Sequence, residues 1–387
     1  MINRSIENKI RLLSEKFPVV IVTGPRQSGK TTLIKSMFPG YRYESLEDPD
    51  TRLFAQSDPR RFLGFREKIV IDEVQRVPDL FSYIQTLSDS QDIPGQFILS
   101  GSQSFLLNHH ISQSLAGRAA IFHLLPFSLD ELWQAKMVPD SPDKILWKGF
   151  FPRLYDKDID PVDFYPNYIQ TYVERDLRLM QNIHDLSLFI RFIKLCAGRI
   201  GQLLNMNSIA VECGISPNTA RAWLSVLEAS YLVYLLVPHH ASFNKRLVKM
   251  PKLYFTDSGL ACSLLEIRNE SQLGSHYMRG SLFEGFVISE LLKGRYNRGL
   301  RSNLFFWRDN KGSEIDCLID NPPQITPVEI KSGSTFSTDF FRQINYWNKL
   351  SGNRPENSWV IYGGDTSRIT SFGNLLKWDE VRRVPIV

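Results

Sequence analysis

The sequence lacks the features of secreted, disulfide-bonded and membrane-spanning proteins. Only four of its 387 residues are cysteines, and they stand far apart without paired spacing, which argues against a disulfide framework and a zinc site. The longest apolar run, Tyr231 to Val237, is too short to span a bilayer. The segment from Met1 to Lys16 alternates charged with apolar residues and has no hydrophobic stretch before a cleavage site, so we expect no signal peptide. We therefore expect a protein of the reducing cytoplasm, without a membrane partner.

A large excess of charge of one sign is also missing. There are 46 basic and 41 acidic residues, a net charge of +5 that permits nucleic acid as a partner but does not require it. Between Leu291 and Gly312, basic residues are interleaved with aromatic ones, and Asp309 is the one acid. These basic residues are Lys293, Arg295, Arg298, Arg301, Arg308 and Lys311. Such a patch could hold phosphates and stack bases. A solvated helix end followed by a half-buried strand is an equally good interpretation.

Length and patterning predict three parts, at residues 1–160, 161–242 and 243–387. In the first part, short apolar strands are predicted at 18–23, 68–72 and 96–100, with a helix at 30–38 after the first strand. This pattern favours an α/β fold with a parallel sheet covered on both faces. The middle part has helical periodicity. In the last part, strands and helices alternate again, which predicts an α+β unit. Its predicted strands are 252–256, 304–308, 314–319, 327–331 and 359–362.

The residues from Gly24 to Thr31 form a glycine-containing turn between the first strand and the first predicted helix. They match the P-loop pattern G-x-x-x-x-G-K-[ST] at every fixed position. Glycines let backbone N–H groups curl round a phosphate, and the helix presents its positive end. We therefore predict ATP as ligand, with Lys30 at the β- and γ-phosphates and Thr31 on Mg²⁺. The predicted nucleotide-binding residues are Gly24, Pro25, Arg26, Gln27, Ser28, Gly29, Lys30, Thr31 and Thr32.

The second apolar strand ends in two consecutive acids, Asp72 and Glu73. Consecutive acids at the end of a buried strand are costly without a cation or a substrate. We predict that Asp72 holds the magnesium shell and that Glu73 polarises the attacking water. The third strand ends at Ser100, whose hydroxyl is predicted beside the γ-phosphate, with Ser102 as the alternative. Arg118 could bring positive charge to the transition state, within its own subunit or across an interface, and is equally well explained as a surface residue.

Several phrases together carry a family resemblance: TGPRQSGKTTL, IVIDEVQRVPDL, FILSGSQSFLL and SLAGRA, with Pro126-Phe127 following. With these phrases the chain resembles the prokaryotic AAA-type ATPases that carry a C-terminal domain of unknown function. The similarity extends over nearly the whole chain and includes the segment from Tyr172 to Asp176. The resemblance implies an AAA+ fold, an ATP-dependent activity and, by analogy, a homo-oligomer. It implies no biological substrate.

In the middle part, residues 208–227 fit a helix-turn-helix. Gly214 supplies the turn, and Ser216 and Pro217 are well placed as the N-cap and first residue of the second helix. We predict a winged helix, in agreement with the family resemblance. Arg221 is the one basic residue on the second helix, so DNA binding and a structural or protein-contact role both stay open.

The last part contains a second group of charged residues. Glu284 lies on the apolar stripe of a predicted helix, Asp316 on one strand, and Glu329 and Lys331 on one face of the next strand. An acid, about a dozen residues and then Glu-x-Lys is similar to the PD-(D/E)xK, restriction-endonuclease-like fold. That resemblance implies Mg²⁺ ligands at Asp316 and Glu329, an auxiliary ligand at Glu284, and Lys331 orienting water. A solvated strand face or an inactive nuclease fold is also compatible, and the usual proline before Asp316 is absent.

These patterns lead to one main functional prediction. It is a Mg²⁺-dependent ATPase whose cycle moves a winged helix and a nuclease-like unit, on or near DNA. One alternative is an ATP-gated, metal-dependent DNA nuclease. The other is an ATP-switched regulator that binds DNA or a protein without cutting.

Overall fold

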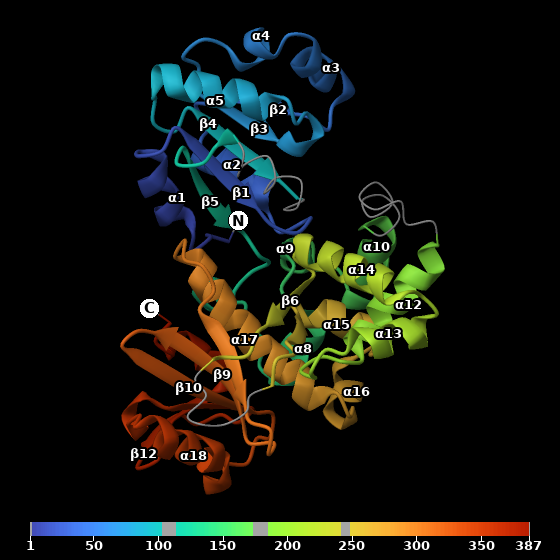
Figure 1. Cartoon of the computed structure of the whole chain (residues 1–387), viewed down its shortest axis with the longest axis vertical. Helices are drawn as coiled ribbons and strands as arrows, with labels where there is room; N and C mark the ends of the chain where they lie inside the picture. Colours follow the sequence, from blue (N-terminus) through green and yellow to red (C-terminus); the bar gives the residue numbers. More distant parts are fainter. Residues whose placement is uncertain (1, 103–113, 173–184, 241–247, 387) are drawn as a thin grey trace. The chain divides into compact units, whose positions relative to one another are not determined.

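The computed structural model in Figure 1 describes residues 2–102, 114–172, 185–240 and 248–386. By internal contacts the chain forms two compact units. The first unit contains Met1–Phe127 and two short connecting segments, Ala229–Tyr231 and Tyr296–Leu300. The second contains Ser128–Glu228, Leu232–Arg295 and Arg301–Val387. The boundaries expected near residues 160 and 242 therefore remain a prediction.

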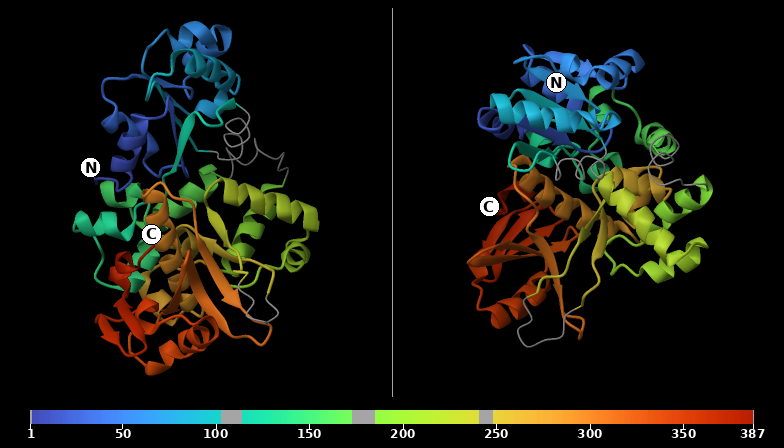
Figure 2. Two further views of the ribbon diagram at one scale, coloured as in Figure 1. Left: turned by 60° about the vertical axis from the view of Figure 1, so that its left-hand side comes forward. Right: turned by 45° about the horizontal axis from the view of Figure 1, so that its top comes forward.

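The first unit is built on a five-stranded sheet with the strand order β2-β3-β4-β1-β5. This unit is the blue to blue-green part of the ribbon in Figure 2. Every neighbouring pair is parallel, which confirms the predicted parallel sheet. The strands are β1 (Val19–Thr23), β2 (Arg42–Ser45), β3 (Ile69–Asp72), β4 (Phe97–Gly101) and β5 (Ala119–His123). The strands β1, β3 and β4 are buried along their whole length. This burial explains why they were recognisable as continuous apolar runs.

Helices cover both faces of this sheet. They are α1 (Glu7–Ser14), α2 (Lys30–Met37), α3 (Pro49–Ser57), α4 (Pro59–Leu63) and α5 (Leu80–Gln91). One apolar core joins residues of α1 and α2, such as Ile10 and Ile34, to alternate strand residues such as Val20 and Ile98. A second core joins residues of α4 and α5 to the other strand face. Because side chains alternate along a strand, both faces need apolar residues, and both have them.

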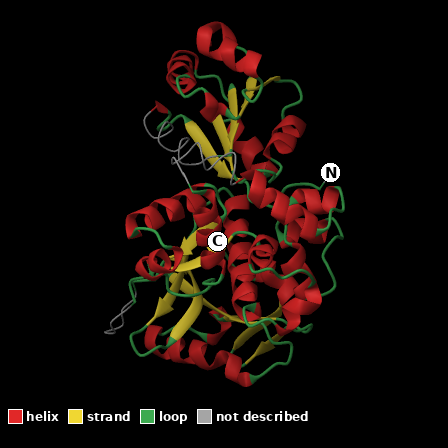
Figure 3. Cartoon of the chain, turned by 90° about the vertical axis from the view of Figure 1, so that its right-hand side faces the viewer, coloured by secondary structure: helices red, strands yellow, loops and turns green. Residues whose placement is uncertain are grey.

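The second unit contains a six-stranded mixed sheet with the order β12-β13-β11-β10-β9-β8, drawn in yellow in Figure 3. Its strands are β8 (Leu304–Arg308), β9 (Glu314–Asn321), β10 (Gln324–Lys331), β11 (Trp359–Tyr362), β12 (Arg368–Thr370) and β13 (Gly373–Lys377). The helix α18 (Arg342–Ser351) packs on this sheet through Trp347, which contacts Trp307 with a ring-centroid distance of 5.2 Å. A separate antiparallel pair consists of β6 (Val233–Leu236) and β7 (Lys252–Phe255).

The rest of the described second unit is mainly helical. Its helices are α7 (Leu129–Gln134), α8 (Pro142–Lys148), α9 (Pro152–Asp156), α10 (Pro161–Tyr172), α12 (Leu186–Ala197), α13 (Met206–Cys213), α14 (Pro217–Ala229), α15 (Ser258–Leu264), α16 (Glu270–Ser275) and α17 (Arg279–Asn297). Within the described segments, we find no helix that combines the length and apolar character needed to cross a membrane.

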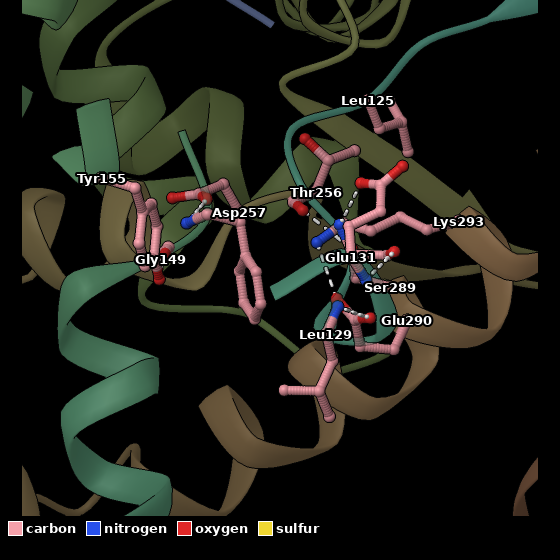
Figure 4. Close-up of polar contacts among 12 residues, drawn as sticks. Leu125, Leu129, Glu131, Gly149, Tyr155, Thr256, Asp257, Ser289, Glu290 and Lys293 are labelled. Carbon is pink, nitrogen blue, oxygen red and sulfur yellow. Dashed lines mark hydrogen bonds and ion pairs between the residues drawn. The ribbon is translucent and has the colours of Figure 1, made fainter. Parts of the chain in front are cut away.

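A buried polar contact fastens α17 to the start of α7, as Figure 4 shows. Glu290 on α17 accepts a hydrogen bond from the backbone N–H of Leu129 at 2.6 Å, and its other oxygen accepts one from Lys293 at 2.7 Å. The ammonium of Lys293 lies 3.7 Å from the ring centroid of Phe150. Burial raises the pKa of Glu290, although the charge of Lys293 acts in the opposite direction. Lys293 is therefore used internally rather than as part of a basic surface.

Candidate functional site

The turn after β1 has positive φ angles at three positions. Gly24 has φ of 155° and Gly29, at the N-cap of α2, has φ of 93°. A Cβ at Gly24 would lie 2.1 Å from the carbonyl oxygen of Leu124, so this position requires glycine. Between them, Gln27 also has positive φ, at 59°. The loop therefore curls tightly against the end of β5 and leads directly into α2.

Lys30 folds back into this loop. Its ammonium donates to the carbonyl oxygens of Gly24 at 2.9 Å and Pro25 at 2.8 Å, and the residue is only 6% exposed. A lysine held inside the loop by two neutral carbonyl groups is placed to meet any anion that enters the loop. Ser28 Oγ is buried in the same loop and has no hydrogen-bond partner among the described residues. The loop thus offers both charge and an unused hydroxyl.

The other predicted loop residues differ in their exposure. Pro25 is buried, Arg26 is half-buried, and Gln27 and Thr32 are exposed. Thr31 is half-buried and points to β3.

Asp72 lies at the centre of a set of hydroxyl groups. It accepts hydrogen bonds from Thr31 Oγ1 at 2.7 Å and from the Tyr43 hydroxyl at 2.8 Å, and it also accepts one from the Ser100 hydroxyl. Burial and the Asp72 carboxylate together raise the pKa of Tyr43, so its phenol stays protonated and continues to donate. Carboxylate and hydroxyl oxygens are the donors that Mg²⁺ prefers, so Thr31 and Asp72 fit this ion.

Glu73 follows in a left-handed conformation, with φ of 55° and ψ of 44°. Its carboxylate accepts hydrogen bonds from the Ser102 hydroxyl at 3.1 Å and from the Gln75 side chain. A non-glycine residue in this conformation is uncommon and is kept only where surrounding contacts fix it. The two predicted serines are thus divided between the two acids, Ser100 at Asp72 and Ser102 at Glu73.

The structure does not bring Arg118 to these acids. Its guanidinium pairs with Asp89 and donates to the carbonyl oxygen of Ala116 at 3.0 Å. A catalytic role for Arg118, in its own subunit or across an interface, therefore stays a prediction.

Two residues at this site were missed from the sequence, Arg4 and Tyr43. Arg4 is buried and donates to the carbonyl oxygens of Ser28 at 2.7 Å and Leu125 at 2.6 Å. It therefore joins the N-terminal segment to the loop and to the chain that follows β5. Tyr43 lies on β2, a short polar strand without an apolar pattern. No sequence signal near either residue points to the loop.

The second charged group also comes together, in the second unit. Lys331 pairs with Glu329 at 2.6 Å and lies 3.8 Å from Asp316, whose carboxylate accepts the backbone N–H of Ile330 at 2.8 Å. Burial and the neighbouring Asp316 raise the pKa of Glu329 well above its ordinary value. Its Oε1 is buried and has no hydrogen-bond partner in the described part of the chain. A proton on that oxygen fits both observations.

Glu284 is held by two residues that the sequence did not reveal. Its Oε1 accepts hydrogen bonds from Lys252 at 3.0 Å and from the Tyr254 hydroxyl, both on β7. Burial raises the pKa of Glu284 to about 7, with Lys252 opposing and Asp316 adding to this shift. Burial alone would lower the pKa of Lys252, but Glu284 and the other nearby carboxylates raise it above its ordinary value. Lys252 therefore stays charged.

The predicted metal site at Glu284, Asp316 and Glu329 was tested against these contacts. In the described residues, no group of three or more His, Cys, Asp or Glu side chains is placed to hold a metal ion. The side chains as placed do not fit an Mg²⁺ ion held by all three acids, because Lys252 pairs with Glu284 and Lys331 pairs with both Glu329 and Asp316.

The predicted helix-turn-helix corresponds to α13 and α14. Gly214 ends α13 in the left-handed conformation, and the Ser216 hydroxyl accepts the backbone N–H of Thr219 at 3.0 Å, as a cap of α14 does. Arg221 is exposed and donates to the side chain of Asn218 at 3.1 Å. A winged helix and DNA binding are not established by this geometry. Residues 173–176 of the segment that begins at Tyr172 lie outside the described residues.

Three family models match consecutive parts of the chain. An AAA domain matches residues 16–133, which contain the loop and the acids. Two domains of unknown function, DUF8612 and DUF4143, match residues 140–271 and 279–378. The chain thus has an AAA-type P-loop ATPase fold at its N-terminal end.

Whole-chain relatives are also found. The uncharacterized proteins Rv2008c of Mycobacterium tuberculosis and Mb2031c of Mycobacterium bovis are 31% identical over 340 residues, covering 86% of this chain and 74% of theirs. An uncharacterized protein of Haemophilus influenzae is 23% identical over 347 residues, covering 81% of this chain and 82% of its own.

Among solved structures, the Walker-type ATPase PABY2304 of Pyrococcus abyssi has 16% identity and a TM-score of 0.47, covering 68% of this chain and 96% of its own. AMPPCP-bound DnaA from Aquifex aeolicus has 14% identity and a TM-score of 0.28, covering 58% of this chain and 85% of its own. On the strength of the identity and coverage of the mycobacterial relatives, the chain belongs to the same family as Rv2008c and Mb2031c, and its residues 16–133 match the AAA domain.

Proposed function

We propose that the chain binds ATP with Mg²⁺ in the loop from Gly24 to Thr31 and hydrolyses it. The observation that carries this proposal is the hydrogen bond of 2.7 Å between Thr31 Oγ1 and Asp72 Oδ2. It joins the end of the phosphate-binding loop to the acids of β3, which lie far away in the sequence. The two halves that phosphoryl transfer needs are thus adjacent.

Each loop residue has a defined part in binding. Lys30 gives up the carbonyl groups of Gly24 and Pro25 and pairs with phosphate oxygens, which carry full charge. The backbone N–H groups at the start of α2 face the same anion. Thr31 and Asp72 are the residues that would hold Mg²⁺, an ion that neutralises phosphate charge when it is bound. Ser100, hydrogen-bonded to Asp72, senses the occupied site through that carboxylate.

Glu73 is the proposed general base. Ser102 and Gln75 fix its carboxylate, so it can orient a water molecule and accept its proton without first reorganising. Because general-base catalysis contributes about 10²–10⁴-fold, Glu73→Gln should lower turnover by about that factor. The variant should still bind ATP, since the Lys30 contacts are intact.

Phosphate release by the purified chain with ATP and Mg²⁺ tests this proposal. Glu15→Gln, which removes an exposed acid of the same unit, is the matched control and should behave like the unaltered protein. If Glu73→Gln turned over ATP at the unaltered rate, Glu73 would not be the base. If the unaltered protein and Glu15→Gln both failed to bind and hydrolyse ATP, the proposal itself would be wrong.

Arg118 has a proposed role in contacts between copies of the chain. We propose that it leaves Asp89 and completes the ATP site of a second copy, as the expected homo-oligomer requires. Turnover per chain should then rise with protein concentration, and Arg118→Ala should remove that rise. Turnover that is independent of concentration would contradict this part.

We further propose that the nucleotide cycle moves the second unit, which acts on or near DNA. The capped α14 with exposed Arg221 supports a nucleic-acid contact. Fluorescence anisotropy with duplex DNA, repeated at rising salt, tests it, because phosphate contacts weaken with salt. Arg221→Ala should weaken binding.

Two other functions are distinguished by the same experiments. Slow turnover, with a nucleotide-dependent change in DNA or protein binding, would favour the ATP-switched regulator. The ATP-gated nuclease has the least support, because lysines pair with its proposed metal ligands. Cutting of supercoiled plasmid with Mg²⁺ and ATP, lost in Asp316→Asn, would establish it.

A further inference from the structure

A buried lysine lies among the carboxylates of the second unit. The side chain of Lys252 on β7 is 3% exposed, and its ammonium pairs with Glu284 and with Glu314. Removing an ammonium from water costs several kcal/mol, and close carboxylates are what repay this cost. The two carboxylates are therefore partners that Lys252 cannot give up without leaving its charge buried and unpaired.

The two carboxylates that face Lys252 are also bound by other side chains. Glu284 Oε1 accepts a second hydrogen bond, from Tyr254. Glu314 Oε2 pairs with the guanidinium of Arg308 at 3.1 Å. A metal ion that used these carboxylates would have to displace an ammonium, a phenol or a guanidinium, each of which already provides the positive end of a hydrogen bond.

A second lysine, Lys331, lies among the neighbouring carboxylates Glu329 and Asp316. Lys331 pairs with Glu329 and approaches Asp316, which is also held by the backbone N–H of Ile330. One buried oxygen, Glu329 Oε1, lacks a partner in the described part of the chain. Mg²⁺ is usually held by one or two carboxylates together with waters, and here Lys331 already pairs with both Glu329 and Asp316.

With the proton placed on Glu329, three charged carboxylates face three cations in this cluster. The carboxylates are Glu284, Glu314 and Asp316, and the cations are Lys252, Arg308 and Lys331. The cluster is thus balanced by its own side chains. A divalent cation would add two charges to a balanced set.

We propose that this cluster is a metal-independent ion network, in which the ammonium of Lys252 occupies the place from which a divalent cation would bind Glu284 and Glu314. The second unit then keeps its structure, and does its work, without a bound metal. Lys252 is the residue that decides this, because it pairs with both the helix acid Glu284 and the strand acid Glu314.

The test is Mn²⁺ binding by the full chain without nucleotide, followed by water-proton relaxation and by melting temperature. The unaltered protein and Asp316→Asn should give the same Mn²⁺ relaxation signal. Neither Mn²⁺ nor a chelator should shift the melting temperature of the unaltered protein. Lys252→Met, which keeps the stem and deletes the charge, should bind Mn²⁺ roughly tenfold or more tightly than the unaltered protein. Glu314→Gln, added to that variant, should abolish the gain.

Two results would overturn the network. One is Mn²⁺ binding by the unaltered protein that Asp316→Asn abolishes. The other is a folded Lys252→Met protein with no gain in Mn²⁺ affinity. If Lys252→Met does not fold, the relaxation and chelator measurements on the unaltered chain and Asp316→Asn still decide. Lys16→Met, at an exposed site, controls for loss of a charge. None of these outcomes depends on ATP hydrolysis.

Discussion

Replacing Lys30 by alanine should remove most of the affinity for ATP and leave the fold intact. The Lys30 ammonium donates hydrogen bonds to the carbonyl oxygens of Gly24 and Pro25. On binding, it exchanges these neutral acceptors for charged phosphate oxygens. Hydrogen bonds to charged groups contribute about 1.5–3 kcal/mol each, so losing two costs about 3–4 kcal/mol at the lower end of that range. The dissociation constant should therefore rise roughly 200- to 1000-fold.

Stability should change much less. The variant loses the two carbonyl contacts, but it also no longer buries an ammonium, and these two effects largely cancel. We expect the free energy of unfolding to change by about 1 kcal/mol or less.

The assay is an equilibrium titration with a fluorescent ATP analogue and Mg²⁺, followed by anisotropy, beside a thermal melt. Lys16→Ala deletes the same charge from an exposed position of the same unit and should bind like the unaltered protein. A Lys30→Ala protein that melts normally and keeps its affinity would refute the assignment of the loop. Loss of both binding and the melting transition would show that Lys30 supports the fold.

Three further predictions concern positions that the structure singles out. Gly24→Ala should destabilise the first unit by about 2 kcal/mol or more, because a Cβ would lie 2.1 Å from Leu124 O. Gly40→Ala, with no atom within 4 Å of its Cβ, should melt nearly as the unaltered protein does. Arg4→Ala should weaken ATP binding roughly tenfold in the same titration, because the substitution removes the hydrogen bond to the carbonyl oxygen of Ser28 in the loop. Arg4→Lys should restore part of the affinity. Burial raises the pKa of Glu290, so the stability that this group contributes is fully present below its ordinary pKa and is lost as pH rises through the raised pKa. The free energy of unfolding, measured at several pH values, should therefore fall over this range in the unaltered protein and not in Glu290→Gln.

The parts of the first unit that were predictable are those encoded locally. The loop from Gly24 to Thr31 lies between two elements that its own neighbours define, and β1, β3 and β4 are continuous apolar runs because both of their faces are covered. The strands β2 and β5 were missed. β2 is an edge strand of half-buried polar residues, and a strand with one free edge needs no such apolar run.

Contacts made across long sequence distances were not predictable. Arg4 reaches Leu125 and Lys252 reaches Glu314, and nothing near any of these residues signals the other. For Glu284, sequence reasoning required a partner for an acid on an apolar stripe but could not identify it. The partner is a lysine in the structure, where the motif had suggested a metal. A motif specifies which side chains meet, whereas the charge balance of the site depends on every residue that the fold adds.

The placing of β1 between β4 and β5 has a mechanical consequence. Hydrogen bonds hold this strand on both sides, so the loop at its end is anchored more firmly than a loop on an edge strand. The strand β5, beside β1, is at the edge of the sheet. The chain leaves β5 through Leu124, whose N–H donates to Thr23 at 2.7 Å, and runs straight on into the second unit. If nucleotide binding shifts β5, the covalent chain carries that shift to Ser128, where the second unit begins.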